Sequence, residues 1–327
     1  MSKDKPLITV MTASWNREKY LKVLINSLKN QTYKNFEWII GNDGSIDNTD
    51  KLIRSLSKKV KFKITYIRSS LRIGKTSMVN LLSDKISGEY LIECDSDDYF
   101  LPDAFKNLLD EIKKNKLNEN KNFIAVMAQN VDTNGVSQTF KKNVPKKAEL
   151  LKWEDLLKKH DGDGTILARS KNFKNKKYLE VDFLISESSL LNKIYKNKTF
   201  LLTPIIAKVM DRRTNNSTTF SNKIQYTRGW AYCMAINETL NVFTKKKFMS
   251  KIFIIINYWR YVLHGDINFY KALKMFKPIK KNFLYTLLFP ISYVISLRDL
   301  FLKKVFKTHI EFNKNKKNTK INIEFIN

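Results

Sequence analysis

Apolar segments of strand length alternate with amphipathic helical segments through residues 7–131, and this alternation constrains the fold more than any other feature of the sequence. After the first strand, apolar residues recur at Leu21, Leu24, Ile25 and Leu28, which is the spacing of a helix with one buried face. Strands that alternate with helices form a mostly parallel sheet covered on both faces. The sequence therefore predicts an α/β fold. The expected strands lie at 7–11, 36–45, 62–68, 88–98 and 123–131, and the further helices at 50–56, 78–86 and 102–116.

Polar residues follow each of the first four predicted strands, at 12–16, 42–45, 74–75 and 95–98. In a parallel sheet, ligands bind beyond the carboxyl ends of the strands, so we expect these residues on one rim. Such a rim combines an aromatic side chain for stacking, an acid for hydrogen bonding to a base, a lysine near phosphate and an acidic cluster for a divalent ion.

The acidic cluster places three carboxylates, Asp95, Asp97 and Asp98, within four residues directly after an apolar strand. Like charges this close repel one another unless a cation lies among them. Oxygen ligands suit Mg²⁺ or Mn²⁺, and these ions usually bridge to a substrate phosphate. Spacing alone leaves a second interpretation open, in which the cluster is a solvated, helix-capping loop ahead of Pro102.

The segment SSLRIGKTSMVN, residues 69–80, contains Gly74, Lys75 and Thr76, which match the end of a P-loop signature. That signature also needs a glycine where this chain has Ser69, and serine resists the positive φ that glycine adopts. A P-loop kinase is therefore disfavoured. The segment still lies where the diphosphate of a nucleotide would bind.

Two longer stretches resemble a known family. ITVMTASWNREKYLKVLINSLKNQTYKNFEWIIGNDGSIDNT (8–49) and GEYLIECDSDDYFLPDAF (88–105) are similar to the family-2 glycosyltransferases of the GT-A fold. The usual motifs of that family are T-P-T-Y-N-R, S-L-x-x-Q-T, D-D-G-S-x-D-x-T and a D-x-D at the end of the fourth strand. The resemblance covers residues 7 to about 110 and continues weakly to about 220. It implies a GT-A nucleotide-diphospho-sugar transferase fold, a nucleotide-sugar donor, a divalent metal and inversion at the anomeric carbon.

The resemblance also implies roles for individual residues. Asp43 matches the acid that hydrogen-bonds the uracil edge, and Asp95 and Asp97 match the D-x-D, with Asp97 the direct ligand of Mn²⁺ or Mg²⁺. Lys75 and Asn80 match a stretch that borders the nucleotide. The implied nucleotide-sugar-binding residues are Thr12, Ser14, Trp15, Asn16, Asp43, Lys75, Asn80, Asp95 and Ser96, and the implied metal ligands are Asp97 and Asp95.

Three positions depart from the family pattern. Trp15 stands where tyrosine is usual, Asn42 where the first aspartate of D-D-G-S is common, and Ala13 replaces the proline. The base-binding acid is retained, so these differences leave the identity of the donor open.

An inverting transfer needs a general base that deprotonates the acceptor hydroxyl. Glu187, in FLISESSLLNKI, matches the acid of the family's E-[DGS]-x-x-[LIVW] segment, so the resemblance implies that it is this base, with Asp182 as the fallback. From the residues alone, Glu187 equally fits an acid in the first turn of a helix, where the helix dipole favours it.

The C-terminal part of the chain differs in composition. We expect residues 1–222 to form the glycosyltransferase domain and 223–327 a basic, aromatic, helical region, whose terminal INIEFI is either an extra strand or unstructured. The net charge is +29, and residues 245–327 contain 18 lysines and arginines against four acidic residues. The apolar segments 252–263 and 283–297 are too short to span a bilayer. They predict helices that lie on a membrane or pack on each other.

Cysteine usage and charge indicate location and partners. Cys94 and Cys233 have no metal or redox spacing and fit a reducing compartment. Basic residues beside aromatic ones favour an anionic membrane surface. We therefore expect a cytoplasmic protein that is peripheral at the inner face of the plasma membrane.

Together these features predict a metal-dependent, inverting hexosyltransferase. It would move a sugar from a nucleotide sugar, with a UDP-sugar favoured, to a glycan or polyprenyl-linked acceptor in surface polysaccharide synthesis. The alternative is a basic nucleic-acid-binding protein without catalysis. The charge favours this alternative, but no nucleic-acid-binding motif occurs and three aspartates lie in the expected cleft, so we expect no nucleic acid partner.

Overall fold

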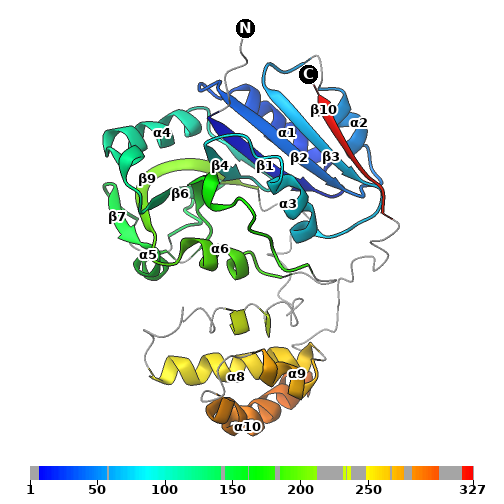
Figure 1. The fold of residues 1–327 in the computed structure, drawn as a ribbon, viewed down its shortest axis with the longest axis vertical. Helices are drawn as coiled ribbons and strands as arrows, with labels where there is room; N and C mark the ends of the chain where they lie inside the picture. The colour runs from blue at the N-terminus through cyan, green and yellow to red at the C-terminus, as the bar shows by residue number, and fades with distance from the viewer. Residues whose placement is uncertain are drawn as a thin grey trace. The chain divides into compact units, whose positions relative to one another are not determined.

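The computed structural model divides into two compact units (Figure 1). The first unit contains Met1–Lys177, Tyr195–Ser217 and Asn315–Asn327, and the second unit contains Tyr178–Ile194 and Thr218–Lys314. The units interleave along the sequence, and the predicted domain boundary between residues 222 and 223 stays a prediction. The structure describes residues 7–56, 59–140, 144–160, 162–180, 185–211, 231–232, 234–236, 248–265, 267–275, 282–301 and 319–326.

A mixed sheet forms the centre of the first unit. Among the described residues it is 10-stranded, in the order β10-β3-β2-β1-β4-β8-β6-β9-β5, with β7 paired to β9. The neighbours β3, β2, β1 and β4 run parallel, as the alternating pattern predicts. The strands are β1 Ile8–Ser14, β2 Phe36–Asp43, β3 Lys63–Ser69, β4 Tyr90–Glu93, β5 Asp98–Phe100, β6 Phe123–Asp132, β7 Glu149–Lys152, β8 Thr165–Arg169, β9 Thr199–Met210 and β10 Ile321–Ile326.

Helices pack on this sheet through apolar faces. In α1, Leu21, Leu24, Ile25 and Leu28 are buried, and they are the four residues that the sequence spacing predicts. They join one apolar core with residues of the sheet such as Trp38. The other helices of the first unit are α2 Thr49–Arg54, α3 Lys75–Ser83, α4 Ala104–Lys114 and α5 Trp153–Lys159, and α1 spans Glu18–Lys29.

The five predicted strands and four predicted helices of the first half are all present, with ends that differ by a few residues. Strand β9 was not predicted. It is 12 residues long, contains Pro204 and pairs with β6 through several register shifts. Proline removes a ladder donor and normally excludes a segment from a central strand. In this structure the Pro204 carbonyl instead accepts a hydrogen bond from Gln129 Nε2 at 2.8 Å, which satisfies the backbone at the irregularity.

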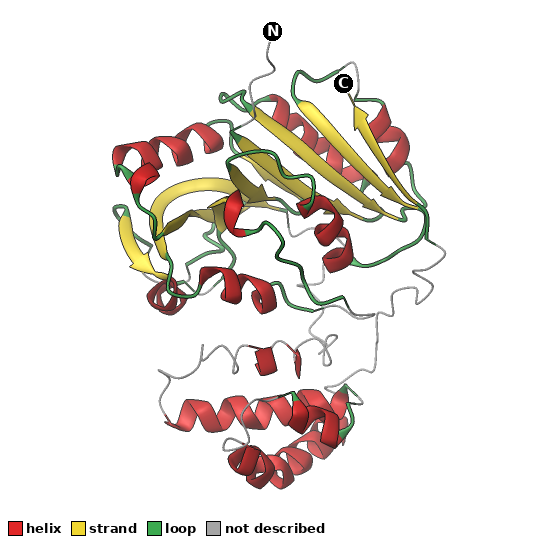
Figure 2. Cartoon of the chain, viewed as in Figure 1, coloured by secondary structure: helices red, strands yellow, loops and turns green. Residues whose placement is uncertain are grey.

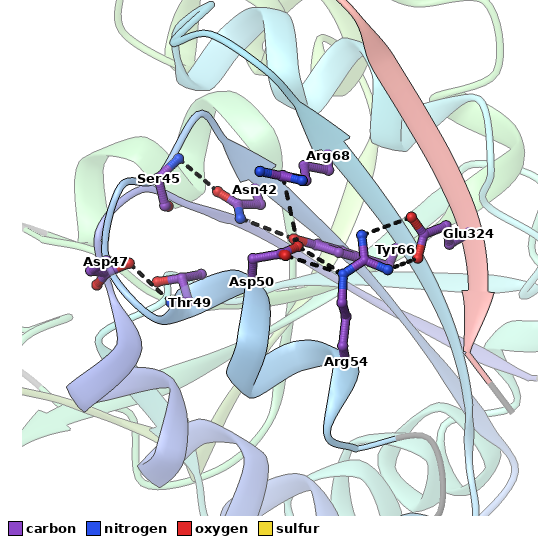
Figure 3. Close-up of polar contacts among 9 residues, drawn as sticks. All are labelled: Asn42, Ser45, Asp47, Thr49, Asp50, Arg54, Tyr66, Arg68 and Glu324. Carbon is purple, nitrogen blue, oxygen red and sulfur yellow. Dashed lines mark hydrogen bonds and ion pairs between the residues drawn. The ribbon is translucent and has the colours of Figure 1, made fainter.

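The C-terminal segment INIEFI is a strand, which confirms one of the two interpretations of the tail. This strand, β10, pairs antiparallel with β3 at the edge of the sheet (Figure 1). Its Glu324 accepts hydrogen bonds from the Arg54 guanidinium, and Arg54 also donates to Asp50 (Figure 3). Asp50 accepts the Tyr66 hydroxyl at 2.7 Å. A polar network therefore ties the tail to α2 and β3.

The second unit is helical throughout its regular described elements (Figure 2). The predicted helices at 252–263 and 283–297 are present and pack on each other, with Trp259 of α8 and Leu288 of α10 in one apolar cluster. Pro290 does not interrupt α10. Within the described residues, no helix combines the length and apolar character needed to cross a membrane. The helices are α6 Ser188–Tyr195, which ends at the division between the units, α8 Phe248–His264, α9 Phe269–Lys274 and α10 Asn282–Phe301.

Candidate active site

The loops that follow β1 and β2 are joined by hydrogen bonds at the carboxyl ends of the strands. The Asn16 amide donates to Ser45 Oγ at 2.9 Å, and the Ile46 amide donates back to Asn16 Oδ1 at 2.9 Å. Asn16 has a φ of 52°, a left-handed conformation that asparagine tolerates better than most residues. The predicted site residue Asn16 therefore holds two rim loops together.

Asp43 connects the second rim loop to the third. Its two carboxylate oxygens accept the backbone N–H groups of Ile73 at 2.6 Å and Gly74 at 2.9 Å, and the residue is 4% exposed. Gly74 has a φ of 93°, which favours glycine at this position directly before α3. Asp43 thus shapes the loop that was compared with a P-loop. Its contact with a nucleobase stays a prediction.

Trp15, the expected stacking residue, already stacks on a side chain of the protein. The Arg72 guanidinium carbon lies 3.6 Å from the centre of the indole ring, a cation–π contact between the first and third rim loops. A nucleobase would therefore have to stack on the other face of Trp15 or displace Arg72.

The acidic loop after β4 meets cations from the other rim loops. Lys75 Nζ lies 2.7 Å from Asp95 Oδ1, and Arg17 Nη2 lies 3.8 Å from Asp97 Oδ2. The Lys75 ammonium lowers the pKa of Asp95 to about 2, so this half-exposed carboxyl is ionised at neutral pH. Burial, and after it the negative charge of Asp95, raises the pKa of Asp97 above its ordinary value. Asp97 is thus harder to ionise than its neighbour Asp95.

Asp98 does not share the position of the other two aspartates. It begins β5 and forms a buried ion pair with Lys208 of β9, at 2.6 Å, with both side chains less than one-tenth exposed. Burial raises the pKa of Asp98 to about 6, although the Lys208 ammonium opposes this shift. The repulsion that the sequence predicts is therefore partly offset by cations of the chain itself, and a divalent ion among the aspartates stays a prediction. Each aspartate has a lysine or arginine of the chain within 4 Å.

The two carboxylates at the rim fit a divalent metal ion that the protein and a phosphate-containing substrate would hold together. No cluster of three or more histidine, cysteine or acidic residues suitable for a metal occurs in the part of the chain that the structure describes. Asp95 and Asp97 supply two carboxylates, and proteins commonly hold Mg²⁺ through one or two carboxylates together with substrate phosphates. A divalent cation would also offset the burial and repulsion that raise the pKa of Asp97.

Four other predicted residues are buried inside the first unit. Thr12 Oγ1 accepts the Trp38 indole N–H at 3.1 Å, and Ser14 Oγ donates to the Gly41 carbonyl at 2.8 Å. Both hydroxyl groups are therefore hydrogen-bonded to residues of the neighbouring strand β2. Asn80 and Ser96 are 5% and 6% exposed. Their contact with a nucleotide sugar stays a prediction.

Glu187 lies in the second unit, whereas the rim belongs to the first. It immediately precedes α6, and its carbonyl accepts the amides of Leu190 and Leu191, both at 3.1 Å. It therefore stands at the start of a helix, as its sequence context indicates, and its role as general base stays a prediction. Asp182, the fallback, is outside the described residues.

Sequence reasoning missed three cations at or behind the rim: Arg17, Arg72 and Lys208. Arg17 directly follows the quoted TASWN segment, so its place after the first strand was an available signal. Lys208 gave no local signal, because its contact with Asp98 spans 110 positions of the chain and depends on the pairing of β5 with β9.

Comparison with known proteins supports the resemblance. The model of the family described as "Glycosyl transferase family 2" matches residues 9–175. A Campylobacter jejuni protein named GalNAc(5)-diNAcBac-PP-undecaprenol beta-1,3-glucosyltransferase is 26% identical over 201 residues, which are 60% of this chain and 62% of that protein. An uncharacterized glycosyltransferase of Haemophilus influenzae is 34% identical over 110 residues, 34% of each chain. This chain thus spans less than two thirds of the length of either relative.

Solved structures show the same fold. Staphylococcus aureus TarS 1–349 in complex with UDP-GlcNAc has a TM-score of 0.58 and 16% identity, and the match covers 94% of this chain and 97% of that one. The mannosyltransferase PcManGT of Pyrobaculum calidifontis, in complex with GDP-Man and Mn²⁺, has a TM-score of 0.50 and 13% identity over 91% and 88% of the two chains. The mixed α/β architecture with its mostly parallel central sheet is that of GT-A glycosyltransferases. The nucleic-acid alternative finds no support among these matches.

Proposed function

Because the chain belongs to glycosyl transferase family 2, we propose that it transfers a sugar from a nucleotide sugar, with UDP as the nucleotide, to a glycan or polyprenyl-linked acceptor. The transfer inverts the anomeric carbon and builds a surface polysaccharide. The protein works in the cytoplasm at the inner face of the plasma membrane. The complexes of TarS with UDP-GlcNAc and the name of the Campylobacter relative support the donor and acceptor classes.

The observation that carries this proposal is the contact between Lys75 and Asp95. It joins the loop after β3 to the loop after β4, and the contacts of Arg17 and Asp43 bring the loops after β1 and β2 to the same rim. A nucleotide diphosphate needs cations for its phosphates and a divalent ion that bridges them to carboxylates. The rim supplies both kinds of group within one connected set of residues.

Each group at the rim has a proposed task. A bound Mn²⁺ or Mg²⁺ would neutralise charge on the leaving diphosphate, and Asp97 with Asp95 would hold the ion. Lys75 would turn from Asp95 to the diphosphate, because its ammonium lies 2.7 Å from a carboxylate that the ion would then neutralise. Asp43 would position the base while it keeps its loop in place. Glu187 would take the proton from the acceptor hydroxyl.

The test combines donor binding with sugar transfer. We expect the full chain to be stabilised against thermal unfolding by UDP-GlcNAc or another UDP-sugar with Mn²⁺, because a ligand that binds only the native state raises its stability. Loss of a group that only supports a metal ligand typically lowers activity by about 10- to 100-fold. Asp97→Ala removes a proposed direct ligand, so we expect it to reduce transfer by about a hundredfold or more.

The matched control is Asp155→Ala, which removes a half-exposed aspartate of α5 whose lysine partner lies three residues along the same helix. We expect it to keep both the stabilisation and the transfer. Full transfer by Asp97→Ala, or transfer that survives EDTA unchanged, would contradict the proposal.

A further inference from the structure

Helix α10 buries several polar residues and exposes several large apolar ones. Leu288, Ser292, Ser296 and Asp299 lie at intervals of four, four and three residues and are all buried. The stripe therefore forms one face of the helix. A helix of a water-soluble domain normally buries its apolar stripe and exposes its charges. Among the α10 residues whose side chains the structure describes, three of the four buried ones are instead polar.

The buried polar residues of α10 have partners within the second unit. Asp299 Oδ2 accepts hydrogen bonds from Arg260 Nε at 2.8 Å and Nη2 at 2.6 Å, and Asp299 is 1% exposed. The Ser292 and Ser296 hydroxyls donate to the carbonyls four residues earlier in the helix. Asp299 is thus satisfied by α8, and this pairing fixes which face of α10 points inward.

Between Leu287 and Phe301, one exposed stripe of α10 is mostly apolar. Leu287, Ile291, Val294 and Phe301 are 59%, 50%, 65% and 85% exposed and lie on one stripe. Arg298 is the charged member of that stripe and is also largely exposed. Large apolar side chains gathered on one exposed face indicate a surface that binds another apolar phase or molecule.

The charge of the residues around α10 indicates what this exposed apolar face binds. Residues 245–307 contain 14 lysines and arginines and two acidic residues, and one of those two is the buried Asp299. In the sequence, Lys280 and Lys281 immediately precede α10, and Lys303 and Lys304 follow it closely. A second copy of the chain would carry the same positive charge and be repelled. An anionic lipid surface attracts such a segment, at about 1 kcal/mol per basic residue near it.

We propose that the Leu287–Ile291–Val294–Phe301 face of α10 inserts into the interfacial layer of an anionic bilayer. This inference rests on the membrane location proposed above and assigns it to one surface. In this arrangement α10 lies in the plane of the interface, with its exposed apolar stripe toward the lipid tails and basic residues close to it in the sequence. The Arg298 guanidinium lies 3.8 Å from Asp299 in this structure, and its long apolar stem would let it turn to the headgroups.

The experiment is flotation of the full chain with vesicles of phosphatidylglycerol and phosphatidylcholine, and with vesicles of phosphatidylcholine alone. We expect flotation with the anionic vesicles and much less with the neutral ones. Val294→Glu should weaken partitioning into the anionic vesicles roughly tenfold or more, because withdrawing one buried valine side chain alone accounts for about that factor.

The matched control is Val136→Glu, which makes the same change at a valine that is 58% exposed in the turn after β6 of the first unit. It should float like the original chain. Both variants should keep their stabilisation by UDP-GlcNAc with Mn²⁺, which shows that folding and donor binding are intact.

Each other outcome has a distinct meaning. If the original chain does not float with anionic vesicles, the membrane location itself is wrong. If Val294→Glu and Val136→Glu float equally well, the membrane is bound by another surface and this face of α10 is not the anchor.

The original chain could instead form a dimer that Val294→Glu dissociates, with neither form floating. That result would assign the face to a second copy of the chain and overturn the inference. Flotation as expected without donor stabilisation would leave the inference standing and contradict the transferase proposal.

Discussion

Helices α1 and α10 turn different kinds of residue toward the interior of their units. α1 buries Leu21, Leu24 and Leu28 against the sheet and exposes Lys19 and Lys22. α10 buries serines and an aspartate and exposes leucine, isoleucine, valine and phenylalanine. The first arrangement gains free energy by removing apolar area from water. The second buries polar residues beside a smaller apolar contact at Leu288 and leaves a further apolar stripe uncovered, which can bind a less polar phase.

The largest expected effect is on stability when the apolar face of each helix is truncated. Leu24→Ala in α1 should lower the free energy of unfolding by about 2–5 kcal/mol, because it leaves a cavity in the core. Leu297→Ala in α10 should change it by less than about 0.5 kcal/mol, because that side chain is 49% exposed. Urea unfolding of both variants measures the difference. An equal loss from the two would break the comparison, since it would mean that Leu297 is packed.

A smaller effect is expected from the polar interior of α10. Asp299→Ala leaves the Arg260 guanidinium without its carboxylate and should lower stability by about 1–3 kcal/mol, the usual penalty for an unsatisfied buried group. Leu297→Ala, at a half-exposed position of the same helix, is the control and should be nearly neutral. Thermal unfolding of the full chain compares them. A neutral Asp299→Ala would show that polar contacts do not orient α10.

The smallest expected effect concerns the polar network that ties β10 to α2 and β3 (Figure 3). Burial alone would raise the pKa of Asp50, but hydrogen bonds from Tyr66 and Arg54 and the charges of Arg54 and Arg68 bring it below its ordinary value. A carboxyl whose pKa is lowered by folding stabilises the native state above its unfolded pKa of about 3.9, and this contribution is lost as the pH falls through the folded value.

Asp50→Asn should therefore reduce stability at neutral pH by less than about 1 kcal/mol, because partly exposed ion pairs contribute little. It should also make the loss of stability below about pH 4 shallower. Urea unfolding at a series of pH values measures both the free energy of unfolding at neutral pH and its decrease on acidification. If the variant and the original chain lose stability in parallel on acidification, Asp50 does not contribute in this way.

The sequence predicted the elements of the first half well because their signals are local. The apolar spacing of α1 and the apolar run of β1 are each contained within about a dozen residues, and the structure reproduces both. Strand β9 was missed because Pro204 is a local argument against a strand, whereas its pairing with β6, β5 and β7 is a long-range one. Tertiary pairing prevailed over local preference there.

At the rim the residue types were predictable but their partners were not. Asp95, Asp97 and Lys75 follow strand ends, so their common location followed from the parallel sheet. Lys75 pairs with Asp95, and Asp98 pairs with Lys208 of β9. Both contacts form between side chains from distant segments of the chain, so the local sequence did not predict them. The charges of a short segment indicate the repulsion, which still raises the pKa of Asp97, but they do not indicate the cations from distant segments that offset it.

The sequence by itself determined the family, the order of the first strands and helices and the set of polar residues at their ends, because periodicity and motif spacing are properties of contiguous residues. Only the tertiary structure decided which cation meets each aspartate, that Arg72 covers one face of Trp15, and that α10 turns its apolar face outward. These depend on contacts between residues far apart in the chain, and burial and electrostatic energies are set by those contacts rather than by neighbours in sequence.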